Sequence, residues 1–276
     1  PTTIAAEFAE TTPTKCKFFK RHISSTLDEA GKAKMTFAGY GKLALADFMI
    51  YPAPSNSRRT FSFDIDAKGV GNHTLTGAGF FVNAGINGTS SSATVNGYLL
   101  FYEFTTQVSG NIYLIPMNNV NAMNFQTSNV TGLYSKAIAK DTFNLGASKK
   151  ARIDVDLQSR SLTVQQRNYT SSGTFEETKT LFGGKAVAME ATGYNGFGPM
   201  AAYKSHGCSE LSSFVFSDLE MNYEANAFDA LKNVQYAEDA DYKYFINLAG
   251  TNADPGVPED KENYLEGVKR LNENEI

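Results

Sequence analysis

The chain has 276 residues, of which 42% are hydrophobic and 20% are charged, with 25 basic and 29 acidic residues. A chain of this length and composition can bury a full hydrophobic core, which excludes wholesale disorder and suits one large β domain or two smaller ones. The net charge of −4 gives no reason to expect a nucleic-acid partner, because such partners are bound by clustered Lys and Arg. No apolar run approaches the roughly 20 residues that cross a bilayer, so we expect no membrane insertion within the chain.

The chain begins with a polar segment and continues with strand-like runs. We expect residues 1–16 to be a flexible lead-in and residues 17–23 to be a short strand. Residues 43–51 fit a strand or a helical turn, which Pro52 ends. Residues 60–66 alternate between apolar and polar side chains, which is typical of a strand with one buried face.

Further short strands are predicted along the rest of the first 223 residues, at 79–83, 97–104, 110–115, 151–157, 162–166, 186–190 and 212–223. The short break between the runs that end at 157 and begin at 162 indicates a hairpin. Many strands at spacings of roughly 8–12 residues favour an antiparallel sandwich or a barrel, and the periodicity alone does not separate the two.

The composition changes near residue 224. Residues 1–223 carry 20 basic and 17 acidic residues, whereas residues 224–276 carry 5 basic and 12 acidic ones. The pattern of residues 224–276 is typical of helices around one strand, which is too small a unit to bury its own core. This α/β segment either packs on the sandwich or begins a following domain, and we favour the second reading. The nearly neutral first part suits uncharged sugars or mixed protein surfaces.

Most of residues 17–223 resembles the concanavalin A-like lectin/glucanase jelly roll, which is shared with laminin G modules. The segments that carry the resemblance are 73–83 with 97–102, the pair 151–157 and 162–166, and 193–200 with 212–223. Residues 201–212 are similar to modules of large secreted surface proteins of Gram-positive bacteria, which look like parts of adhesins. The resemblance implies a mainly β sandwich in an extracellular or bacterial cell-surface setting. It specifies the fold better than the activity, because the fold hosts lectins, hydrolases and protein-binding modules alike.

Two segments combine amides and aromatic rings with Gly, namely 83–96 and 193–207, and we interpret them as recognition loops. Aromatic faces stack on sugar rings and Asn side chains satisfy sugar hydroxyls. The expected ligand is a host glycan or, second, a matrix or cell-surface protein, and the expected contacts are Asn83, Asn87, Tyr194, Asn195, Phe197, Tyr203 and His206. The alternatives are that Tyr194 and Phe197 only plug the end of the sandwich, and that the module is a spacer without a ligand.

Carboxylates at alternate positions raise two further hypotheses. Asp64 and Asp66 suggest a calcium site built from carboxylates and loop carbonyls, although Lys68 in a ligand position excludes an EF-hand. The same pair and Asp154 with Asp156 are the only carboxylate pairs offered for a carbohydrate-active hydrolase. Neither pair has a third Glu in step, and the solvated side of a half-buried strand explains both. We therefore expect a non-catalytic module.

Two cysteines permit a single disulfide, Cys16–Cys208, which would fit an oxidising compartment. The alternative is a packed thiol. His206 stands two residues before Cys208, but a Cys–His dyad normally draws its members from separate elements, so we do not expect nucleophilic catalysis there.

Overall fold

The computed structural model describes residues 4–10, 15–19, 23–39, 45–52, 58–70, 76–88, 92–122, 125, 132–158, 160–203 and 212–223. The chain divides into two compact units, Pro1–Tyr223 and Glu224–Ile276, and the described residues belong to the first. The predicted α/β segment at 224–276 lies outside the described residues, as do His206 and Cys208.

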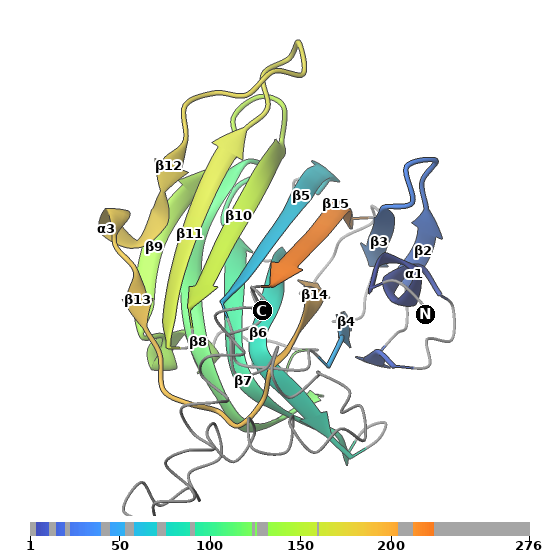
Figure 1. Ribbon diagram of the computed structural model, residues 1–276. Helices are drawn as coiled ribbons and strands as arrows, with labels where there is room; N and C mark the ends of the chain where they lie inside the picture. Colours follow the sequence, from blue (N-terminus) through green and yellow to red (C-terminus); the bar gives the residue numbers. More distant parts are fainter. Residues whose placement is uncertain are drawn as a thin grey trace, which may run out of the picture. The chain divides into compact units, whose positions relative to one another are not determined.

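Two sheets, which we call sheet A and sheet B, make up the described unit (Figure 1). In order across sheet A the strands are β1 (Lys17–Phe19), β4 (Leu45–Ile50), β14 (Gly196–Tyr203), β6 (Thr76–Asn87), β7 (Thr94–Phe104), β8 (Ser109–Asn121) and β9 (Ala139–Asn144). In order across sheet B they are β12 (Lys179–Thr180), β11 (Ser161–Asn168), β10 (Lys150–Gln158), β5 (Arg59–Gly69), β15 (Ser212–Tyr223), β3 (Ala33–Gly39) and β2 (Ile23–Leu27), with β13 (Val187–Ala188) beside β11. Neighbouring strands pair antiparallel throughout.

The main core lies between the two sheets. The alternation of β5 turns Phe61, Phe63 and Ile65 inward, where all three are buried. Phe63 stacks on Phe80 of β6 with ring centroids 4.6 Å apart and an interplanar angle of 11°. Because β5 belongs to sheet B and β6 to sheet A, this contact joins the sheets face to face. The predicted antiparallel sandwich is confirmed, and the barrel is excluded.

A second core covers the other face of sheet A. Neighbouring residues of one strand fall into different cores: Phe80 belongs to the first, and Phe81 belongs to the second. Phe125 and Leu133, from the segment that follows β8, pack into this second core. Burial on both faces explains why residues 97–104 show a nearly continuous apolar run rather than an alternation.

The first residues differ from the expected loose lead-in, because Ile4–Ala9 form the helix α1. Phe8 is fully buried in the main core, and its ring centroid lies 5.8 Å from that of Phe197. The carboxylate of Glu7 accepts hydrogen bonds from the backbone N–H groups of Lys15 and Cys16, at 2.9 and 3.1 Å. The segment is polar in composition, yet one aromatic side chain fastens it to the sandwich.

Several elements were not expected from the sequence. The strands β3 and β9 and the short helices η3 (Tyr134–Lys136) and α3 (Leu181–Gly184) have no predicted counterpart. The expected recognition loops are largely strand, because β6 runs to Asn87, β7 resumes at Thr94, and residues 196–203 form β14. None of the helices in the described part of the chain is long and apolar enough to cross a membrane.

Candidate functional site

The two segments that we interpreted as recognition loops meet at Tyr194. The side-chain N–H of Asn87, the last residue of β6, donates a hydrogen bond to the Tyr194 hydroxyl at 2.8 Å. The Tyr194 ring lies on the backbone of Gly85, where an added Cβ would be only 2.1 Å from the ring atom Cδ1. Tyr194 is half-buried. One face and the hydroxyl of the ring are therefore held, and part of the side chain remains open to solvent.

Two amides continue this surface across β7 and β8. Asn96 lies directly opposite Gly85 in the β6–β7 ladder, so its side chain leaves the sheet on the side that carries the Tyr194 ring. The Asn96 side chain donates to Oδ1 of Asn119 at 3.2 Å and accepts from the Asn119 backbone N–H at 2.9 Å. We call Asn87, Asn96, Asn119 and Tyr194 the amide–tyrosine surface. Sequence reasoning missed Asn119, although the run Asn118-Asn119-Val120-Asn121 was a signal for it.

A buried arginine lies beneath this surface and explains Asn83 and Asn195. Arg59 is 1% exposed, and it donates from Nη1 to the Asn195 carbonyl at 2.6 Å and from Nη2 to Oδ1 of Asn83. Burial lowers the pKa of Arg59 to about 10. Arg59 Nε and Asn195 Oδ1 are buried without a partner among the described residues. Asn83 and Asn195 thus contact the buried Arg59. Asn83 also has the left-handed φ of 47°.

Other predicted contacts do not reach this surface. Phe197 is fully buried, with its ring centroid 4.6 Å from that of Phe61, so the prediction that it binds a ligand is wrong and the alternative of a core plug holds. Tyr203 pairs with Thr76 at the end of β14 away from Gly196, about 23 Å along the strand from the Tyr194 region. The backbone of Tyr203 therefore lies away from the amide–tyrosine surface, and its predicted ligand contact stays a prediction. His206 lies outside the described residues.

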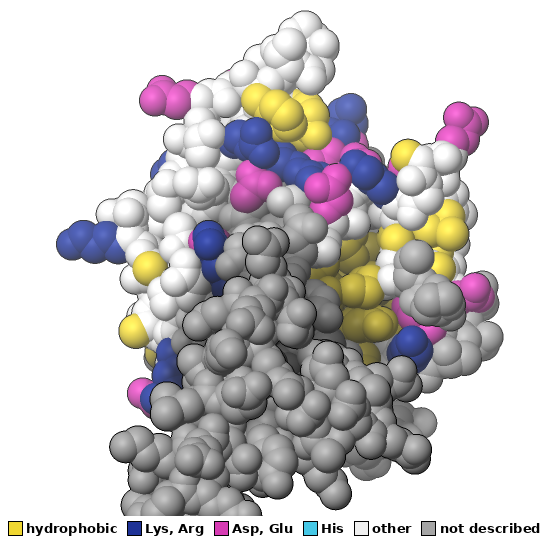
Figure 2. All heavy atoms as spheres, viewed as in Figure 1, with side chains coloured by type: hydrophobic (Ala, Val, Ile, Leu, Met, Phe, Trp, Pro, Cys, Tyr) yellow, Lys and Arg dark blue, Asp and Glu magenta, His cyan; other side chains and the backbone are white. Residues whose placement is uncertain are grey.

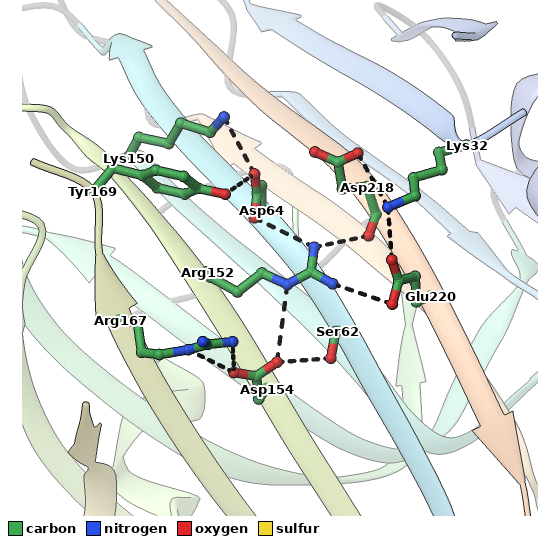
Figure 3. A network of polar contacts seen from close by, with 10 residues as sticks. All are labelled: Lys32, Ser62, Asp64, Lys150, Arg152, Asp154, Arg167, Tyr169, Asp218 and Glu220. Atoms are coloured by element: carbon green, nitrogen blue, oxygen red, sulfur yellow. Dashed lines mark hydrogen bonds and ion pairs between the residues drawn. The ribbon is translucent and has the colours of Figure 1, made fainter. Parts of the chain in front are cut away.

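The proposed calcium position at Asp64 is occupied by protein cations (Figure 3). The Asp64 side chain is 1% exposed and lies 3.2 Å from Lys150 Nζ and 3.4 Å from Arg152 Nη1, and the Tyr169 hydroxyl donates to it at 2.6 Å. Two cations would repel Ca²⁺, whose sites are built from oxygen ligands. Asp66 turns its Oδ1 to the backbone N–H of Lys68 at 2.9 Å. The calcium prediction is corrected at these two residues, and the described residues contain no group of three or more His, Cys, Asp and Glu side chains that could hold a metal.

Asp64 belongs to a larger network on the outer face of sheet B, with Arg152 at its centre (Figure 3). Arg152 lies 3.5 Å from Glu220 and 3.9 Å from Asp154, and Arg167 holds Asp154 at 2.8 Å. Lys32 donates to Glu220 at 2.6 Å, and this hydrogen bond lowers the pKa of Glu220. Acids and bases are equal in number across the network, which is made up of Lys32, Ser62, Asp64, Lys150, Arg152, Asp154, Arg167, Tyr169, Asp218 and Glu220. We call these ten residues the ion-pair network.

Ion pairs engage three of the four carboxylates that the sequence offered for a hydrolase. A glycosidase needs one carboxylic acid and one carboxylate that both reach the substrate. Asp64 does not reach solvent, Asp154 is held by Arg167, and Asp156 is paired with Arg58 at 3.0 Å. The interpretation of these side chains as structural charges of an outer strand face explains all three.

Cys16 is buried, with 4% of its surface exposed. Its predicted partner Cys208 lies outside the described residues, so the disulfide stays a prediction.

Comparison with known proteins gives similarity of structure only. No family model matches the chain, and no curated protein matches its sequence. Among solved structures, the carbohydrate recognition domain of Emp46p in its potassium-bound form is 11% identical with a TM-score of 0.47, over 80% of this chain and 96% of that one. The lumenal domain of VIP36 bound to Ca²⁺ and Man3GlcNAc is 12% identical with a TM-score of 0.43, over 82% and 91%. A legume lectin-like domain from Entamoeba histolytica is 12% identical with a TM-score of 0.45, over 76% and 91%. The fold assignment rests on the two sheets described above.

Proposed function

We propose that this protein is a non-catalytic, extracellular carbohydrate-binding module and that the amide–tyrosine surface contacts uncharged sugar. The observation that carries the proposal is the fixed position of Tyr194, which lies on Gly85 and accepts a hydrogen bond from Asn87. A ring that is already held loses little conformational entropy when a ligand packs on it.

The chemistry of the surface matches that of a sugar. The apolar face of a pyranose packs on an aromatic ring, while amides donate to and accept from its hydroxyls. Asn96 and Asn119 hold one another, so their remaining donors and acceptors have set directions. No described carboxylate hydrogen-bonds to these four side chains, which suits a neutral ligand better than a cationic one.

We place the module on a bacterial surface protein that acts in adhesion, with a host glycan as the first ligand and a host matrix protein as the second. The resemblance of residues 201–212 to modules of Gram-positive surface proteins supports this setting. A ligand-free spacer is the competing function.

The test compares Tyr194→Ala with Tyr194→Phe on an array of neutral oligosaccharides, followed by calorimetry on the best binder. Loss of the ring should weaken binding about fivefold to thirtyfold, because one stacking contact contributes about 1–2 kcal/mol. Tyr194→Phe keeps the ring and loses the hydrogen bond from Asn87, so we expect a loss of about twofold to fivefold.

Phe175→Ala is the matched control, because Phe175 is a 44% exposed aromatic residue outside the surface. We expect its binding, and wild-type binding in EDTA, to stay unchanged. A chain that binds no glycan with or without EDTA would end the carbohydrate proposal and favour the spacer.

A further inference from the structure

We infer that the described unit has a second ligand site, a lysine-lined pocket that binds the carboxylate or sulfate group of an acidic saccharide. The pocket has a volume of about 550 Å³ and lies where β5 ends, β10 begins and β11 ends. Its lining is Lys68, Ala147, Ser148, Lys149, Lys150, Tyr169, Thr170, Ser171 and Gly173. We call it the lysine pocket.

The lysine pocket is separate from the amide–tyrosine surface. Lys68 is close to the last residue of β5, whereas Arg59, which supports Asn83 and Asn195, is the first. Nine residues of extended strand place these two ends about 30 Å apart. A ligand bound at one site therefore leaves the other site free.

The charges around the pocket are unequal. Among the described residues, no Asp or Glu lines it, and of its three lysines only Lys150 is paired with a carboxylate, that of Asp64 at 3.2 Å. Lys149 Nζ donates to the neutral side chain of Gln107 at 2.9 Å, and no ion pair joins Lys68 to another described residue. Asp66 is the nearest further carboxylate by sequence, and its Oδ1 accepts from the Lys68 backbone N–H. Lys68 and Lys149 thus carry ammonium groups that form no ion pair with a described acid.

The positions of these lysines are built by the fold. Lys149 has the left-handed φ of 54°, and its carbonyl accepts from the Ala67 backbone N–H at 2.9 Å, which ties the turn before β10 to the end of β5. Lys150 Nζ lies 4.4 Å from the centroid of the Tyr169 ring and, as Figure 3 shows, points with the Tyr169 hydroxyl to Asp64. In the space-filling view, Lys and Arg side chains lie among Asp and Glu side chains beside an apolar patch on this face (Figure 2).

The chemistry of the pocket suits a hydroxylated ligand whose acidic groups each carry a single charge. Lysine ammonium groups act as point charges, which suit carboxylate or sulfate groups without the fork geometry that an arginine imposes. Ser148, Thr170 and Ser171 add hydroxyls that can face the neutral part of the same ligand. The positive pocket does not depend on the proposed function, but the choice of a saccharide as carrier of the anion rests on it.

The test compares four ligands. Two are acidic, a galacturonate tetramer and a chondroitin sulfate tetramer. The third is the methyl ester of the galacturonate tetramer, which is the same sugar without charge, and the fourth is inorganic sulfate. At low salt we expect the two acidic tetramers to bind and the methyl ester to bind at least tenfold more weakly. The Lys68→Gln/Lys149→Gln double variant should lose about fivefold to twentyfold in affinity for them. Raising the salt from 50 to 300 mM should weaken wild-type binding several-fold, because the charges lie at an open pocket.

The control is the double variant Lys34→Gln/Lys185→Gln, which removes the same charge from two exposed lysines outside the pocket. An equal loss of affinity for the acidic tetramers in both double variants would overturn the inference. Equal binding of the galacturonate tetramer and its methyl ester would also overturn it, as would inorganic sulfate that binds as tightly as the tetramers. Loss of galacturonate binding in Tyr194→Ala would show that the galacturonate tetramer binds at the amide–tyrosine surface, and this result would also overturn the inference. Neutral glycan binding that survives while acidic tetramers fail would sink only the lysine pocket, whereas failure of both ligands would remove the proposed function too.

Discussion

Gly85 determines where the Tyr194 ring lies. An added Cβ at this position would meet three atoms of the ring, the nearest at 2.1 Å, so the absence of a side chain is what allows the ring to lie on β6. Arg59 acts from below by joining the carbonyl of Asn195 to the side chain of Asn83. The amide–tyrosine surface is thus positioned by Gly85 and Arg59, which are not themselves part of it.

The first prediction at this scale concerns Gly85→Ala. The methyl group displaces the Tyr194 ring, so we expect glycan affinity to fall about tenfold while the fold is retained. Binding calorimetry and a thermal melt measure the two effects. Gly132→Ala is the control, since nothing lies within 4 Å of a Cβ added there. Full affinity in Gly85→Ala would contradict a positioned ring.

Part of this surface could be predicted from single residues, and part could not. Asn87 and Tyr194 stood out because amides and aromatics were gathered in glycine-rich segments. The same signal failed at Phe197, because Gly196 and Gly198 serve strand packing rather than a loop. A Cβ at Gly198 would lie 1.8 Å from the Met49 carbonyl, so these glycines let β14 approach its neighbours closely.

At the scale of elements, the alternation of β5 could be read from the sequence, but the neighbours of β5 could not. Asp64 was correctly expected on the face away from Phe61 and Phe63, yet its environment depends on which strand lies alongside. The register places Arg152 of β10 directly opposite Asp64. A carboxylate that resembled a calcium ligand in one strand becomes an ion-pair partner once the second strand is present.

Arg152→Met tests the weight of the ion-pair network. Arg152 is 12% exposed and contacts three acids, so its loss leaves Asp64 and Glu220 undercompensated, and we expect about 2–3 kcal/mol of destabilisation in urea unfolding. Arg58→Met removes an exposed pair with Asp156 and should cost less than about 1 kcal/mol. Equal effects of the two substitutions would mean that the network contributes no more than a surface pair.

For the whole unit, the sequence predicted one sandwich but not the two hydrophobic cores on sheet A. The strands β6 and β7 bury alternate residues in different cores, and their sequence alone does not say what covers the second face. Phe125 and Leu133 do so from a stretch with no strand pattern. The burial of many aromatic side chains in these cores has a consequence for stability at high pH.

Burial, followed by the hydrogen bond to Glu103, raises the pKa of Tyr113 to about 12. Burial also raises the pKa values of Tyr102 and Tyr169. Above pH 10 the unfolded chain releases these protons while the folded chain holds them, so stability is lost as the pH rises from about 10 to 12. The lowered pKa of Arg59 would make stability rise over the same pH range, but this is the effect of one group, whereas three tyrosines lower stability.

Thermal melts at pH 8.5, 9.5, 10.5 and 11.5 should therefore show a falling midpoint above pH 10. The decline should be shallower in Tyr113→Phe, which lacks one of the titrating groups. A midpoint that stays level up to pH 11.5 would show that these tyrosines ionise equally in the folded and unfolded chain.

The position of β15 affects when the protein can fold during its synthesis. This strand, at residues 212–223, is the last of the described unit, yet it lies between β5 and β3 in the middle of sheet B. Until it leaves the ribosome, β5 and β3 have no common neighbour, and each exposes an unpaired edge. At about 5–20 residues per second, that interval lasts on the order of tens of seconds. A nascent chain stopped before residue 212 would hold sheet B as two separate halves, each with an exposed strand edge that could pair with another chain.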